Sequence, residues 1–294
     1  MRTATRRRIW LIPALLAFIL LAVGLFFFLR KELDPHKGQV YIYDGFDWIW
    51  YTPLEGVKAN PWTEEDFVFI GGRPVYLHED YETKVGIDVS EHQHEIDWTQ
   101  VSRANLDYAY IRVGRRGYTE GGLFEDPYFR KNMQGARTAG LDVGVYFFSQ
   151  AISVGEAIEE ARFVLDLIKD YRVDLPVVFD WEKIASDDSR TKELTVETRT
   201  DCAVAFCETI KNAGYTPAIY FNRNIGYYGF DLSRLTEYAF WFALPEASYP
   251  SFYYAVDSWQ YSFAERIPGI DMETDMNLMF FPVQQQEETE EKAA

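Results

Sequence analysis

The feature that most constrains this chain is an alternation of strand and helix patterns that begins at Val85. Short apolar runs are followed by amphipathic stretches, several of which end at a glycine, and the order repeats along the chain. Alternation of this kind builds parallel sheets, because each helix returns the chain to the same edge. The last third keeps the strands but has little helix between them. The pattern therefore predicts an α/β fold, an irregular TIM-like β/α barrel with eight strands and fewer helices over residues 85–283.

The periodicity places the elements of this barrel. The expected strands are Val85–Val89, Tyr108–Val113, Val143–Phe148, Pro176–Glu182, Pro217–Phe221, Tyr238–Ala243, Val256–Tyr261 and a last segment near Asp275–Phe280. The expected helices are Trp98–Ala104, Tyr128–Ala139, Val154–Asp170 and Leu194–Asn212.

The fourth strand, Pro176–Glu182, ends in two carboxylates. Side chains alternate along a strand, so Asp180 and Glu182 point to one side while Trp181 points to the other. At ~3.3 Å of rise per residue, the two acids are held 6 to 7 Å apart. Neighbouring carboxylates do not both ionise easily, so we expect one to donate a proton while the other stays charged, as glycoside hydrolysis requires. The alternative is a strand end whose acids face solvent or cap a helix.

Active sites of β/α barrels collect at the C-terminal ends of the strands, and several of these ends carry polar or aromatic side chains. The candidates there are Asp88, Arg112, Tyr146, Asp180, Glu182, Tyr220, Asn222, Trp241, Trp259, Gln260 and Asp275. Aromatic faces stack on pyranose rings and carboxylates accept hydrogen bonds from hydroxyls, so the expected ligand is a sugar polymer. We assign no metal site and no cofactor.

The first part of the sequence predicts a membrane anchor. Ile9–Leu29 contains no charged residue and, as a helix, would span roughly 31 Å, the thickness of a bilayer core. Four arginines precede it, which predicts a single-pass protein with its N-terminus in the cytoplasm and its catalytic domain outside. The alternative is a signal peptide cleaved near Ala22–Gly24, which would give a secreted protein. All 46 acidic residues lie from Glu32 onward, which argues against nucleic acid as a partner.

The sequence divides into four parts. Residues 1–31 are the cytoplasmic tip and anchor, 32–84 a linker and small β-rich segment, 85–283 the catalytic barrel and 284–294 an acidic tail expected to be disordered. In residues 32–84 we expect strands at 39–43 and 48–51, and a hairpin that turns at Gly71-Gly72. Cys202 and Cys207 lie five residues apart in a predicted helix, where they are more consistent with buried fillers than with a disulfide.

Taken together, the barrel motifs resemble those of the family 25 glycoside hydrolases, the barrel-type lysozymes. The motifs that carry the resemblance are Gly86-Ile87-Asp88-Val89-Ser90, Gln93, Ile96-Asp97-Trp98, Tyr110-Ile111-Arg112, Gly144-Val145-Tyr146-Phe147-Phe148, Phe179-Asp180-Trp181-Glu182, Trp259-Gln260-Tyr261 and Thr274-Asp275-Met276-Asn277. The resemblance implies an N-acetylmuramoylhydrolase that cuts the β-1,4 bond between N-acetylmuramic acid and N-acetylglucosamine in peptidoglycan. It places the general acid on Glu182 and companion carboxylates on Asp180, Asp88 and Asp275.

Two positions depart from the family pattern. His94 stands where a glycine usually follows Gln93, and Arg112 stands where many members have lysine. The closeness of Asp180 favours retention of configuration, and either Asp180 or the substrate's own acetamido group could be the nucleophile; we favour the acetamido group. Two other functions stay open: a membrane protein that binds wall glycan without cutting it, and a glycosidase acting on N-acetylglucosamine polymers.

Overall fold

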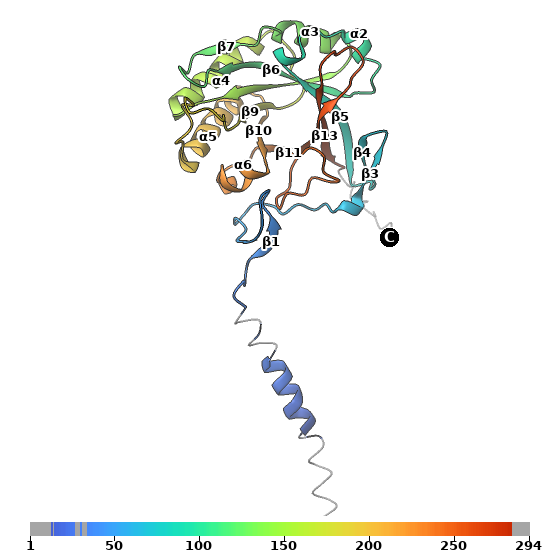
Figure 1. The fold of residues 1–294 in the computed structure, drawn as a ribbon, viewed down its shortest axis with the longest axis vertical. Helices are drawn as coiled ribbons and strands as arrows, with labels where there is room; N and C mark the ends of the chain where they lie inside the picture. The colour runs from blue at the N-terminus through green and yellow to red at the C-terminus, as the bar shows by residue number, and fades with distance from the viewer. Residues whose placement is uncertain (1–12, 14, 27–29, 31–33, 284–294) are drawn as a thin grey trace, which may run out of the picture. The chain divides into compact units, whose positions relative to one another are not determined.

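A computed structural model of the chain describes residues 13, 15–26, 30 and 34–283. It divides the chain into two compact units, Met1–Pro53 and Leu54–Ala294 (Figure 1). The second unit contains the predicted barrel together with residues 54–84. The division thus falls after Pro53, earlier than the end of the predicted β-rich segment at residue 84.

Side-chain contacts explain why residues 54–84 belong with the barrel. Asn60 Nδ2 donates hydrogen bonds to the carbonyl oxygens of Pro250 and Phe252, at 2.6 and 2.9 Å. The buried Trp62 packs on Phe280 with ring centroids 4.0 Å apart. This segment also forms the predicted hairpin, with strands β3 (Phe67–Ile70) and β4 (Arg73–Tyr76) paired antiparallel.

The barrel has the eight strands that the sequence predicts. They are β5 (Tyr81–Val89), β6 (Tyr108–Arg116), β8 (Asp142–Ser149), β9 (Val177–Trp181), β10 (Pro217–Asn222), β11 (Ala239–Ala243), β12 (Ser258–Glu265) and β13 (Thr274–Pro282). Each strand pairs with the next barrel strand along the chain, and the last strand, β13, also pairs with the first, β5, which closes the barrel. All neighbours are parallel except β13, which runs antiparallel to β12 and β5.

Helices connect the first strands and lie outside them (Figure 1). They are α2 (Trp98–Val101), α3 (Phe129–Thr138), α4 (Val154–Ile168), α5 (Val196–Asn212) and α6 (Arg223–Tyr228), with short 3-10 turns at Glu64–Asp66, Glu91–Gln93 and Leu232–Arg234. The short strand β7 (Leu123–Glu125) and helix α6 were not predicted. The described chain has no α-helix between β11 and β13, as the pattern of the last third indicates. Cys202 and Cys207 are free and buried on α5.

Aromatic side chains fill the interior of the barrel. Tyr108 and Tyr110 are buried there, and Tyr110 stacks on Trp241 with ring centroids 4.7 Å apart. Two glycines, on the strands β5 and β8 that flank β6, make room for these rings. A Cβ on Gly86 would lie 2.3 Å from the ring of Tyr108, and one on Gly144 would lie 2.2 Å from the ring of Tyr110. The packed interior leaves the open space at the rim, where the site lies.

The first unit contains the predicted strands β1 (Val40–Tyr43) and β2 (Trp48–Tyr51), which form an antiparallel hairpin. Residues 15–26 are helical. Within residues 13, 15–26, 30 and 34–283, the structure contains no helix with the length and apolar character that crossing a bilayer requires. Residues 9–12, 14 and 27–29 of the predicted membrane segment lie outside the described residues, as does the predicted tail 284–294.

Candidate active site

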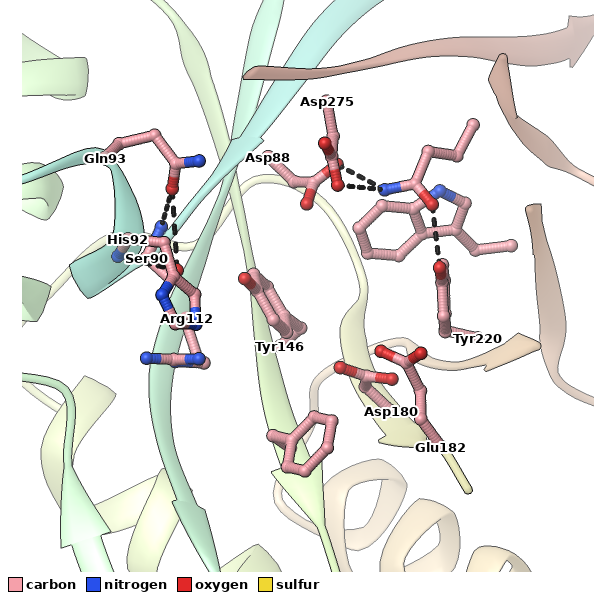
Figure 2. Close-up of a pocket in the computed structure, with 13 residues that line it drawn as sticks. Asp88, Ser90, His92, Gln93, Arg112, Tyr146, Asp180, Glu182, Tyr220 and Asp275 are labelled. Atoms are coloured by element: carbon pink, nitrogen blue, oxygen red, sulfur yellow. Dashed lines mark hydrogen bonds between the residues drawn. The ribbon is translucent and has the colours of Figure 1, made fainter. Parts of the chain in front are cut away.

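A cavity of about 200 Å³ lies at the rim where the parallel barrel strands end. Its lining residues are Asp88, Ser90, His92, Gln93, Arg112, Tyr146, Phe148, Asp180, Glu182, Tyr220, Trp241, Gln260 and Asp275. Nine of the eleven residues proposed from the sequence are among them. The structure therefore brings together all four predicted catalytic carboxylates (Figure 2).

Two predicted substrate-binding residues, Trp259 and Asn222, do not line this cavity. Trp259 is fully buried, its Nε1 donates to the carbonyl oxygen of Leu244, and its ring packs against Phe67. Because side chains alternate on β12, Gln260 faces the cavity and its neighbour Trp259 cannot. Asn222 is the N-cap of α6, where its side chain accepts a hydrogen bond from the Ile225 N–H at 3.0 Å.

Asp88 and Asp275 form one pair of carboxylates in the cavity. They are directly paired across β5 and β13, because the antiparallel course of β13 brings its first residues to the rim where the parallel strands end. Gln260 Nε2 donates to both, at 2.8 Å to Asp88 Oδ2 and 3.1 Å to Asp275 Oδ2. Asn277 Nδ2 donates to the same Asp88 oxygen at 2.8 Å. Side-chain amides therefore fix the position of this pair.

The two members of this pair hold their protons differently. Burial raises the pKa of Asp88 to about 6, against the hydrogen bonds from Asn277 and Gln260, which lower it. Burial, together with the charges of Asp88 and Glu182, raises the pKa of Asp275 to about 9. Asp88 therefore loses its proton at a lower pH than Asp275 does.

Asp180 and Glu182 form the second pair. Asp180 is buried at the end of β9, whereas Glu182 follows the strand and is half-buried. Burial raises the pKa of both carboxyl groups; the charges of Glu182 and Asp88 raise that of Asp180 further, and the charge of Asp88 that of Glu182. We therefore expect this pair to keep a proton near neutral pH. Figure 2 shows both carboxyl groups directed into the same part of the cavity.

Glu182 is held through its main chain. The buried Gln150 donates from Nε2 to the carbonyl oxygens of Ser149 and Glu182, at 2.8 and 3.0 Å. Its Oε1 accepts a hydrogen bond from Thr191 Oγ1 at 2.9 Å, so both ends of the amide are satisfied. Gln150 does not line the cavity, and the sequence analysis did not include it among the site residues. From the sequence Gln150 is recognisable as a polar residue at the end of the third barrel strand, but its contact with Glu182 is not.

Arg112 lines the cavity but is bound by acidic neighbours. Its Nε lies 2.8 Å from Asp126 Oδ2 and its Nη2 lies 2.7 Å from Glu91 Oε1. Asp126 is fully buried, so these contacts fix the guanidinium group against the cavity wall. The charge of Arg112 lowers the pKa of Asp180 and partly offsets the effect of burial. Asp126 and Glu91 were not predicted as site residues, because nothing in the sequence shows that they contact Arg112.

His94 adopts a backbone conformation that explains the glycine expected at this position. Its φ is 54° and its ψ is −136°, in a region that favours glycine. It follows the turn Glu91–Gln93, whose Gln93 and His92 line the cavity. Gln93 Oε1 accepts from the Ser90 N–H at 2.9 Å, which fixes the turn next to Asp88. The substitution is thus accommodated in the loop without displacing a carboxylate.

Comparison with known proteins agrees with the barrel fold. Residues 87–270 match the sequence profile of the glycosyl hydrolases family 25. The chain belongs to this family. It is therefore a glycoside hydrolase. The matched residues include Asp88, Asp180 and Glu182 but end before Asp275, which the structure places beside Asp88.

Individual relatives support the assignment. The Escherichia coli K12 protein YegX is 30% identical over 205 residues, covering 66% of this chain and 68% of YegX. Lysozyme M1 of Streptomyces globisporus is 28% identical over 203 residues, covering 65% of this chain and 66% of the lysozyme. Among solved structures, a family 25 glycosyl hydrolase from Bacillus anthracis superposes with a TM-score of 0.56 at 24% identity, covering 72% of this chain and 93% of that protein. The likeness to this solved structure is a likeness of fold alone.

Proposed function

We propose that this glycoside hydrolase cuts peptidoglycan at the β-1,4 bond between N-acetylmuramic acid and N-acetylglucosamine. The observation that carries the proposal is the pairing of Asp180 and Glu182 in one cavity, where burial raises the pKa of both. A glycosidase needs one carboxyl that is protonated near neutral pH and a second one nearby. Similarity to Lysozyme M1 supports the same substrate class.

Glu182 is the general acid in this proposal. It is half-buried and lies beyond the strand end, so a glycosidic oxygen can reach it more easily than the deeper Asp180. The proton of the pair passes from Glu182 to the glycosidic oxygen as the bond to the anomeric carbon breaks. The resulting carboxylate then takes a proton from the water that completes hydrolysis. The hydrogen bond from Gln150 to the Glu182 carbonyl keeps this side chain in place.

Asp180 assists from the same side of the cavity. Its Oδ1 is buried and has no hydrogen-bond partner among the described residues, so it is placed to accept the N–H of a 2-acetamido group. The acetamido oxygen then attacks the anomeric carbon, and the configuration is retained after water opens the cyclic intermediate. The charged Asp88 stabilises the positive charge that develops on the sugar, while the protonated Asp275 avoids a second negative charge beside it.

The test is digestion of purified peptidoglycan by the full chain in detergent, followed by identification of the new reducing ends. The proposal predicts that every new reducing end is N-acetylmuramic acid. New N-acetylglucosamine ends, or cleavage of chitin oligosaccharides at an equal rate, would support the glycosidase that acts on N-acetylglucosamine polymers. Binding without any release of sugar would favour the wall-binding protein.

We also propose that residues 9–29 anchor the protein in the cell membrane with the catalytic domain outside. The support is the uncharged sequence of this stretch and the four arginines before it. Full-length protein should sediment with membranes and require detergent for release, and protease added outside intact spheroplasts should remove the barrel. A shortened form in the medium, starting near Leu25, would support cleavage instead.

A further inference from the structure

The hairpin of the first unit presents aromatic side chains on one face. In the antiparallel pairing of β1 and β2, Tyr41 lies opposite Trp50. Because side chains alternate, Trp48 lies on the same face, two residues from Trp50. We call Tyr41, Trp48 and Trp50 the aromatic face of the hairpin.

The rings of the aromatic face form a continuous row that is partly open to solvent, although the ring of His36 stacks on Trp50 with ring centroids 3.9 Å apart. The ring centroid of Tyr41 lies 5.0 Å from that of Trp50 and 5.4 Å from that of Trp48. The three side chains are 55, 57 and 46% exposed for Tyr41, Trp48 and Trp50. The residues between them, such as Ile42 and Ile49, are less exposed and face the other way. The hairpin thus turns its largest apolar side chains outward, which marks an interaction surface.

The charges of the hairpin restrict what this face can bind. Residues 40–51 contain Asp44 and Asp47 but no lysine or arginine. Anionic lipid surfaces and other polyanions attract basic residues, so neither suits this hairpin. An uncharged ligand with flat apolar faces does suit it, because aromatic rings stack on the faces of pyranose rings without any charge being required.

We propose that Tyr41, Trp48 and Trp50 form a second glycan-binding site, which holds a strand of the polymer that the barrel would cut. This inference rests on the proposed function for the identity of the polymer. A row of rings in contact along two strands provides a surface for successive sugars of an extended chain. A second weak site on the same chain raises the effective concentration of the polymer at the enzyme and matters most for insoluble material, where one strand can engage both sites.

The first experiment measures binding of the full-length protein to insoluble peptidoglycan in detergent. Every protein compared carries Glu182→Gln, which prevents digestion. The double variant Tyr41→Val and Trp48→Val keeps strand-forming residues but removes two flat rings. We expect its dissociation constant to rise about tenfold, as loss of aromatic anchors from a binding site commonly causes. With Glu182 intact, the same double variant should hydrolyse short soluble fragments within about twofold of the wild-type rate, since those need only the barrel site.

A matched control removes an exposed aromatic side chain from the barrel. Phe263 on β12 is 46% exposed, as Trp50 is, and Phe263→Val should leave binding unchanged. Hydrogen exchange of the peptide covering residues 40–51 shows whether the double variant keeps its hairpin. A second measurement leaves the aromatic face unmutated. The indole N–H resonances of Trp48 and Trp50 should shift when soluble glycan fragments are added to the Glu182→Gln protein.

The outcomes separate this inference from the proposed function. Unchanged binding by a folded double variant, or indole resonances that do not move, would overturn the glycan-binding face even if the wild type digests peptidoglycan. If the double variant binds uncharged phosphatidylcholine vesicles less well than the wild type but keeps its glycan binding, the aromatic face instead contacts the lipid interface. Weakened glycan binding by the double variant, with no digestion by the wild type, would keep the second site and reject the hydrolase.

Discussion

The two carboxylate pairs of the cavity are built differently. Asp88 and Asp275 lie on paired strands, and two side-chain amides donate to their oxygens. Asp180 has an oxygen without a partner among the described residues, and Glu182 is held by a hydrogen bond to its main-chain carbonyl. Hydrogen bonds from amide groups favour the charged form of a carboxylate, whereas a carboxylate with an open oxygen can contact a ligand directly. We therefore propose that the first pair sets the electric field of the site and that the second pair performs the chemistry.

The largest effect should come from Glu182→Gln, which keeps the shape of the side chain but removes its titrating proton. Activity on peptidoglycan should fall by ~10²- to 10⁴-fold, the contribution of general acid catalysis. Glu193→Gln is the matched control, because Glu193 is an exposed carboxylate in the segment after the same strand. The melting temperature should hold or rise, since a carboxyl group whose charged form is disfavoured by burial becomes a neutral amide. If the variant unfolds and its residual activity follows the folded fraction, Glu182 has a structural role.

Asp180→Asn should distinguish assistance from direct attack. The variant can still accept a hydrogen bond from the acetamido N–H, so substrate assistance predicts measurable turnover. A thiazoline mimic of the cyclic intermediate should then inhibit the wild type competitively. Direct attack predicts a nearly inactive variant and covalent labelling of Asp180 by a 2-fluoro sugar, detected by mass spectrometry. An adduct on Asp180 together with no thiazoline inhibition would reverse our preference.

Asn277→Leu tests whether Asp88, in the first carboxylate pair, acts through its charge. Asn277 lowers the pKa of Asp88 and also accepts a hydrogen bond from Trp241 Nε1 at 2.8 Å. Without the donor, the pKa of Asp88 should rise above about 6, so Asp88 is protonated over a wider range. The acid limb of the kcat/KM profile should move to higher pH, and the rate at neutral pH should fall about tenfold. A lower melting temperature with an unchanged pH profile would make Asn277 only a packing residue.

Gln150→Leu should have a smaller effect that acts through position. The variant loses the hydrogen bond to the Glu182 carbonyl, and kcat should fall roughly three- to tenfold while KM changes little. Thr191→Val is the matched control, because it removes the donor to Gln150 Oε1 and leaves the contact with Glu182. Equal losses of kcat in both variants would show that the whole cluster, and not the single bond to Glu182, positions the acid.

The sequence predicted most of the barrel because its elements are long and periodic. The eight strands and four of the helices follow from apolar runs and amphipathic stretches, and alternation on β9 places Asp180 and Glu182 in one cavity. The direction of β13 could not be predicted, since a strand pattern reads the same in both directions. That direction is what pairs Asp275 with Asp88.

The errors at the site have local causes. Trp259 and Gln260 are neighbours, and alternation allows only one of them to face the cavity; the apolar ring takes the buried side. Asn222 caps a short helix that the sequence analysis did not predict, although an Asn three residues before Ile225 fits an N-cap. Gln150 and Asn277 act by donating hydrogen bonds to groups distant in sequence, and only the fold shows those partners.

The central claim is that Asp180 and Glu182 share a proton near neutral pH. The direct measurement is a carboxyl ¹³C NMR titration of glutamate-labelled protein, with the Glu182 resonance assigned by its loss in Glu182→Gln. We predict that Glu182 titrates above its usual pKa of 4.5. In aspartate-labelled Glu182→Gln protein the negative charge of Glu182 is gone, so the pKa of Asp180 should fall relative to the wild type. A Glu182 resonance that titrates at 4.5 in the wild type, together with an Asp180 pKa that is unchanged in Glu182→Gln, would contradict the account.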